Sequence, residues 1–117
     1  MPYNANPSKI FQTTSSTSSV DCFRYQVVAE GGAIVNNIVV FNTSSENETL
    51  QIYLKDSGDA NLTAQVYEQL EEVVLAPKQR FTIKGPIVLN TEDSLGFKST
   101  SMDTVNIFGF GAELYAP

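Results

Sequence analysis

The most regular stretch of the chain is Thr49-Leu50-Gln51-Ile52-Tyr53-Leu54-Lys55. Its apolar residues alternate with polar or amphipathic ones, so in an extended chain Leu50, Ile52 and Leu54 share one face. A slip of one residue in the pairing of such a strand would turn the polar residues inward. The stretch is therefore predicted to be a β-strand that covers a core with one of its faces.

A second predicted strand, residues 33–42, differs from the first because both of its faces are apolar. One face carries Ile34, Ile38 and Val40, and the other carries Val35, Val39 and Phe41. A strand of this kind is expected in the centre of a sheet that is covered on both sides. The second sheet of the fold is one cover, and another subunit could be the other.

Similar segments lie on both sides of these two strands. Upstream, strands are predicted over residues 8–13 and 20–29, separated by a run of serine and threonine that is typical of a loop. Downstream, strands are predicted over residues 71–75, 79–84 continuing after a bend through 87–89, 94–99 and 105–114. Residues 60–75 are ambiguous, because Val66, Leu70, Val73 and Val74 fit one helix face while Val73 and Leu75 also alternate as in a strand. A short helical turn near residues 62–69 is favoured before the strand.

About eight strands separated by turns predict an all-β fold, either an antiparallel β-sandwich or a jelly roll. The regular alternation of strands and helices that marks a parallel α/β sheet is absent from the pattern. The length of 117 residues suits one domain with a core of its own. We expect an extended N-terminal arm with a short first strand over residues 1–19, followed by the sandwich over residues 20–117.

The charge of the chain argues against two classes of partner. Thirteen acidic and seven basic residues give a net charge of -6. A surface of this sign repels nucleic acid and anionic lipid. No apolar run is long enough to span a membrane, and Met1-Pro2-Tyr3-Asn4 lacks the features of a signal peptide. We expect a protein that is made in a cytoplasm and binds neither nucleic acid nor membrane.

The residue types needed for common catalytic chemistry are scarce. There is no histidine, and Cys22 is the single cysteine, so the usual general base, zinc site and nucleophile pairs are missing. The adjacent Glu71 and Glu72 would face opposite sides of a strand. Glu92-Asp93 falls in a turn, where charge is solvated, and the oxygen-rich residues 56–61 do not follow the order of an EF-hand loop. The sequence therefore predicts no enzyme, no cofactor and no metal site.

Four strand-and-turn segments of the chain, taken in their order, resemble a pattern found in a known family. They are residues 25–35 (YQVVAEGGAIV), 38–44 (IVVFNTS), 75–81 (LAPKQRF) and 85–95 (GPIVLNTEDSL). Together with the closing strand over residues 105–114, they resemble small virion proteins of tailed bacteriophages. The chain departs from that pattern at Val28, where proline is usual, and at Lys78 and Glu92, where glycine is usual.

The resemblance implies a structural subunit of a double-stranded DNA phage. We expect a capsid decoration or cement protein, favoured as a trimer, that binds the major capsid protein or other virion subunits. It would be made in the cytoplasm of the bacterial host and reside in the virion. The alternative in the same particle is an adaptor of the neck, tail or fibre. An alternative of another class is a carbohydrate-binding module that uses Tyr53 or Tyr67, although the lack of tryptophan counts against it.

Residues expected to contact other subunits come from three sources: the N-terminal arm, the second face of strand 33–42 and scattered tyrosines. They are Ile10, Phe11, Val35, Val39, Phe41, Tyr53 and Tyr67.

Overall fold

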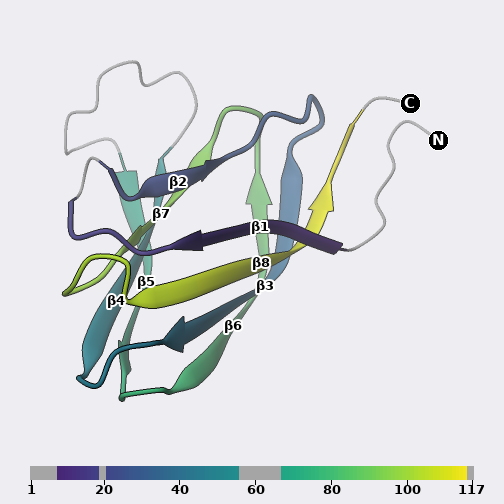
Figure 1. Cartoon of the computed structure of the whole chain (residues 1–117). Coiled ribbons are helices and arrows are strands. Elements are labelled where there is room, and N and C mark those ends of the chain that lie inside the picture. Colours follow the sequence, from purple (N-terminus) through teal and green to yellow (C-terminus); the bar gives the residue numbers. More distant parts are fainter. Residues whose placement is uncertain (1–7, 19–20, 56–66, 116–117) are drawn as a thin grey trace.

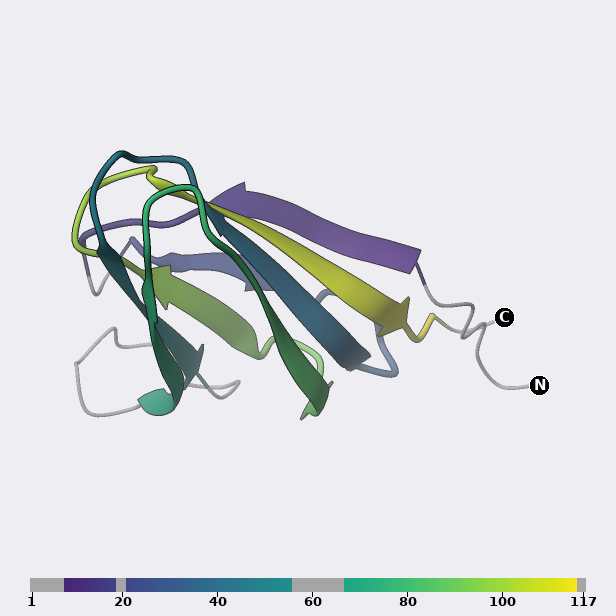
Figure 2. The same cartoon turned by 90° about the horizontal axis from the view of Figure 1, so that it is seen from below.

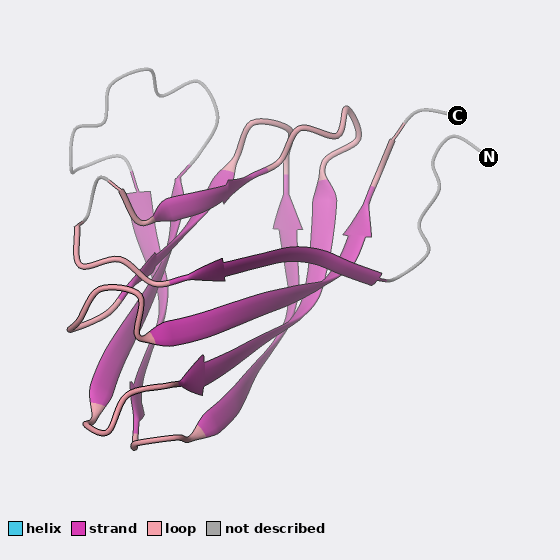
Figure 3. Cartoon of the chain, viewed as in Figure 1, coloured by secondary structure: helices cyan, strands magenta, loops and turns pink. Residues whose placement is uncertain are grey.

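The computed structural model describes residues 8–18, 21–55 and 67–115 (for residues 67–69, the backbone only), and these form a sandwich of two antiparallel four-stranded sheets (Figure 1). One sheet has the strand order β1-β8-β3-β6, and the other has the order β2-β7-β4-β5. The strands are β1 (Ser8–Thr14), β2 (Phe23–Gln26), β3 (Ala33–Asn42), β4 (Glu48–Lys55), β5 (Tyr67–Leu75), β6 (Arg80–Leu89), β7 (Ser94–Lys98) and β8 (Val105–Glu113). Within the described ranges there is no helix (Figure 3).

The chain changes sheet at every connection except the one between β4 and β5, which pair within one sheet. This is the strand order of a jelly roll. Figure 2 shows β1, β8, β3 and β6 side by side in one layer, with strands of the other sheet in a second layer. The predicted all-β antiparallel sandwich is confirmed.

The core lies between the two sheets and follows the alternation seen in the sequence. Leu50 and Ile52 of β4 are buried, as are Leu95 and Phe97 of β7. The strands of the first sheet contribute side chains of the same kind, among them Val35, Ile38, Val40, Ile83, Leu89, Val105 and Ile107.

One aromatic cluster ties β1 into this core. The ring of Phe11 stacks on Tyr25 with 4.4 Å between centroids, and it lies 5.6 Å from the ring of Phe97. Phe11 pairs with Gly109 of β8, and a Cβ at Gly109 would lie 2.0 Å from the Phe11 ring. The glycine therefore leaves the space that the ring occupies.

The short first strand expected within residues 1–19 is present as β1. Residues 8–14 pair along their length with β8 of the same chain, and Ser15 and Ser16 are fully buried. The Ser15 hydroxyl accepts a hydrogen bond from the backbone N–H of Val105, at 3.2 Å. Residues 8–18 thus belong to the sandwich, because a buried serine is stable when its hydroxyl is bonded. Residues 1–7 and 19 lie outside the described residues.

A β-bulge in β3 changes which residues face the core. Val35 pairs with Gly111 and Asn37 pairs with Phe110, so Asn36 is an extra residue relative to β8. An extra residue shifts the alternation by one, and both Val35 and Ile38 are fully buried as a result. The prediction that Val35 shares a face with Val39 and Phe41 is therefore wrong.

The helical turn predicted over residues 62–69 is wrong where the structure describes it. Residues 67–69 begin β5, which pairs with β4 from Lys55↔Tyr67 to Glu48↔Leu75. Pairing with β4 gives this segment long-range backbone hydrogen bonds along one side of the strand, and an isolated short helical turn is only marginally stable by itself. Residues 62–66 lie outside the described part of the chain.

Candidate docking surface

The outward side of the β1-β8-β3-β6 sheet is unusually apolar, and we call it the outer face. The register pairs Val39 with Phe108 and Asn37 with Phe110. These residues alternate with the buried Ile38, Val40 and Ile107, so they point away from the core. Farther along the sheet, Ile34 pairs with Val88, whose side chain is 69% exposed. The apolar members of the outer face are Ile34, Val39, Phe41, Val88, Phe108 and Phe110.

An open hollow of about 510 Å³ lies on the outer face. Its lining consists of Val39, Phe41, Arg80, Asn106, Phe108 and Phe110. Phe110 is 36% exposed although it is a large apolar side chain. A contiguous apolar surface of this kind marks interaction sites in soluble proteins.

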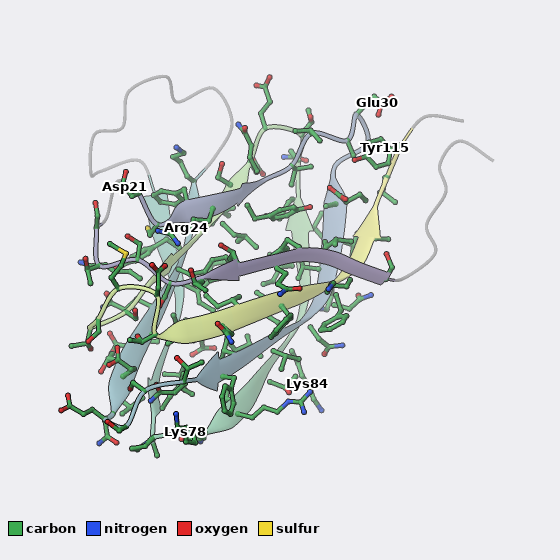
Figure 4. The ribbon with its side chains drawn as sticks, in the orientation of Figure 1. Asp21, Arg24, Glu30, Lys78, Lys84 and Tyr115 are labelled. Atoms are coloured by element: carbon green, nitrogen blue, oxygen red, sulfur yellow. The ribbon has the colours of Figure 1, made fainter. Side chains whose placement is uncertain are left out.

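The outer face is bordered by positive charge. Lys9 of β1 and Arg80 and Lys84 of β6 are all exposed. Lys9 pairs with Phe110, and Arg80 pairs with Phe41, so both cations adjoin the aromatic residues. Lys84 lies within β6 and Lys78 lies in the turn before it, so both are on the β6 side of the sandwich (Figure 4).

Carboxylates are absent from the outer face in the described chain. The four strands of this sheet contain one acidic residue, Glu113. Its Oε2 accepts a hydrogen bond from the hydroxyl of Tyr25, at 3.1 Å, and Tyr25 belongs to the opposite sheet. The carboxylate of Glu113 is therefore directed toward the other sheet.

The outward side of the β2-β7-β4-β5 sheet is mainly polar, although Val74 is 61% exposed there. The Tyr53 hydroxyl donates to Oε1 of Gln51 at 2.9 Å, and Nε2 of Gln51 donates to Oε1 of Glu72 at 2.8 Å. Nζ of Lys55 lies 4.8 Å from the centre of the Phe23 ring. Tyr53, Gln51, Glu72 and Lys55 therefore already have partners within the chain.

The predicted subunit-contact residues separate into three groups. Val39 and Phe41 lie on the outer face, and their contact with another subunit stays a prediction. Phe11 and Val35 are buried in the core of their own chain, and Ile10 is partly buried against it, so these three are not available to a partner.

The two predicted tyrosines belong to the other sheet. Tyr53 lies on its polar side, and Tyr67 lies in β5 with its side chain outside the description. Sequence reasoning missed Arg80, Phe108 and Phe110 as site residues. The alternation of Phe108 and Phe110 with Ile107 and Gly109 is the signal that could have identified the two aromatics.

The buried acidic groups have structural roles. Glu48 is 2% exposed, and its Oε1 accepts from the Ser101 N–H and the Thr104 hydroxyl, both at 2.9 Å. Asp93 was expected to be solvated but is 4% exposed, and its Oδ2 accepts from the Asn90 N–H at 2.8 Å. Both carboxylates hold turns at the ends of strands.

No chemistry of another kind emerges from the described residues. Among them, no group of three His, Cys, Asp or Glu side chains is placed to hold a metal ion. Cys22 is buried, and this burial raises the pKa of its thiol.

A second hollow, of about 310 Å³, opens between the edge strands β5 and β6 and has Ile52, Leu70 and Ile83 in its wall.

Comparisons with known proteins add no relative. The chain matches no protein-family model, no curated protein and no solved structure. In the described part of the chain, no helix has the length and apolar character needed to cross a membrane.

Proposed function

We propose that the protein is a structural subunit of a tailed-phage particle, and that it decorates the capsid by docking its outer face on the shell. The observation that carries this proposal is an apolar sheet face that none of the described residues covers. Aromatic residues dominate the binding energy of protein interfaces when a partner buries them. Phe108 and Phe110 lie on β8, one of the two central strands of this sheet.

The sequence supports the same assignment independently. The order of the four strand and turn segments resembles small virion proteins of tailed phages, and jelly rolls are common in viral shells. A fold of this type serves many functions, so the fold alone does not identify one. The resemblance supports a place in a phage particle, and the outer face supports docking as the way in which the protein binds there.

The test uses phage heads assembled without the chain. Purified protein is sedimented with these heads, and its density is located by electron microscopy. We expect saturable binding on the shell. The double variant Phe108→Ala/Phe110→Ala should weaken this binding by about thirtyfold, because two central aromatic contacts are removed.

A matched variant separates docking from general loss of an aromatic residue. Tyr53→Ala removes an aromatic side chain from the polar outward side of the other sheet, so it should leave head binding unchanged. Density at the neck or tail alone would contradict decoration and support an adaptor. Binding to a glycan array that Tyr53→Ala abolishes would instead support a carbohydrate-binding module.

A further inference from the structure

We infer that the surface docked on the outer face belongs to a different protein and presents an apolar ridge flanked by carboxylates. This inference rests on the proposed function and specifies the chemistry of the shell surface. The supporting observation is the charge of the sheet: its strands carry more cations than carboxylates, whereas the whole chain carries more carboxylates than cations.

The outer face has the opposite sign from the rest of the molecule. The chain carries 13 acidic and seven basic residues. The four strands of the β1-β8-β3-β6 sheet nevertheless carry three cations, Lys9, Arg80 and Lys84, and their one carboxylate, Glu113, bonds to Tyr25. Among the described residues the one ion pair is Arg24 with Asp103, so none of the three cations forms an ion pair there, although Lys84 lines the same hollow between β5 and β6 as Glu71.

The register places these cations around the aromatic residues. One row across the sheet reads Lys84, Asn37, Phe110, Lys9 from β6 to β1. Three strand spacings separate the two lysines, which is about 14 Å at about 4.8 Å per strand. Another row begins with Arg80 beside Phe41. A partner that covers the apolar centre thus meets a positive charge at each end of the Phe110 row and another beside Phe41.

A second copy of this chain fits this face poorly. Two outer faces packed together would bring six cations into one interface with no outward carboxylate to pair them. Like charges placed opposite each other disfavour association. Carboxylates on another protein would pair with the same cations while its apolar side chains fill the hollow.

Single-stranded nucleic acid is the other ligand that combines with cations and aromatic rings. Three cations on a chain with net charge -6 are few for a polyanion with a charge on every phosphate. An acidic protein surface needs only a few carboxylates, each placed opposite one of the three cations. The charge distribution therefore favours a protein over a nucleic acid.

The experiment measures binding to the same phage heads with charge-reversed variants. Arg80→Glu/Lys84→Glu reverses two border cations. Lys55→Glu/Lys98→Glu makes the same change in net charge on strands of the opposite sheet, and thermal melting checks that both variants fold. We expect the first variant to lose at least about tenfold in affinity and the second less than about twofold. Arg80→Gln/Lys84→Gln should give an intermediate loss.

Salt dependence provides a second readout with a defined sign. The affinity of the wild-type chain should fall between about 0.1 M and about 1 M NaCl, as the screening length drops from about 10 Å to about 3 Å. The Arg80→Glu/Lys84→Glu variant should show a weaker fall or a rise. If contact were apolar only, repulsion between two acidic proteins would make affinity rise with salt in both.

The alternative outcomes are distinct. Equal losses in the two charge-reversed variants, or no loss in either, would overturn this inference and leave head binding itself standing. Self-association of the purified chain that Phe110→Ala abolishes would assign the face to a second copy. Salt-sensitive binding of oligo(dT) that Arg80→Glu/Lys84→Glu abolishes would assign it to nucleic acid. Failure of the wild-type chain to bind heads would refute the proposed function, and this inference with it.

Discussion

The two outward sides of the sandwich differ although both sheets have four strands and share one core. On the β2-β7-β4-β5 sheet, Tyr53, Gln51 and Glu72 bond to one another in a chain. On the β1-β8-β3-β6 sheet, the outward positions include the apolar Val39, Phe108 and Phe110, which line an open hollow. The inward positions of both sheets form the core, and the outward positions distinguish a mainly polar surface from the apolar one that we propose as the docking surface.

The largest expected effect is the loss of stability when an inward phenylalanine is replaced. It is compared with the loss at an outward phenylalanine on the neighbouring strand. Phe11→Ala should lower the free energy of unfolding by about 3–5 kcal/mol, since it removes a ring that stacks on Tyr25 and covers Gly109. Phe110→Ala should lower it by less than about 1 kcal/mol, because its ring is 36% exposed in the isolated chain. Chemical denaturation of the two variants measures both values.

Equal losses in these two variants would mean that the outer face is already covered within the isolated protein. The comparison between the two sheets would then fail, because Phe110 would be part of a core. A small loss at Phe110 together with weaker head binding would sharpen the comparison, since the ring would stabilise the complex and not the fold.

The sequence predicted the inward positions well where alternation is regular. Leu50, Ile52, Leu95 and Phe97 occupy the core as their spacing required. The bulge at Asn36 was not predictable from alternation, because one extra residue exchanges the two faces without any change in composition. For this reason Val35 is in the core while Val39 and Phe41, expected beside it, are on the outer face.

Two other features depend on partners that are distant along the chain. The serine run was predicted as a loop, and Ser15 lies outside the strands but is fully buried, where the hydroxyl of Ser99 donates to it at 2.5 Å. Two residues of the outer face, Val39 and Phe41, were among the predicted subunit contacts. The cations beside them come from β1 and β6, which lie at opposite edges of one sheet. This strand order cannot be predicted from the residue pattern of any single segment.

A smaller effect is expected at the hydrogen bond that links the two sheets. Burial and the neighbouring Glu113 raise the pKa of Tyr25 above its usual range. A phenol with a higher pKa in the folded chain stabilises the fold below its unfolded pKa of about 10, and this contribution is lost as the pH rises toward the folded value. Tyr25→Phe should cost about 1 kcal/mol at neutral pH and should flatten the decline in stability above about pH 10.

Denaturation curves at a series of alkaline pH values test this expectation. An unchanged alkaline decline in the Tyr25→Phe variant would show that other groups cause it. If the variant also weakens head binding, the released carboxylate of Glu113 has become available to the outer face. That result would sharpen the comparison, because it would show that head binding by this sheet requires the carboxylate of Glu113 to point away from the outer face.

The smallest effect is expected on the polar side. Gln51→Ala removes the residue that joins Tyr53 to Glu72, but both partners are accessible enough for water to replace it. The free energy of unfolding should change by less than about 0.5 kcal/mol, and head binding should stay the same. A loss above about 1 kcal/mol would mean that this network holds β4 and β5 together. A loss of head binding would mean that the polar side is also a docking surface, and the contrast between the two sheets would no longer identify which one meets the shell.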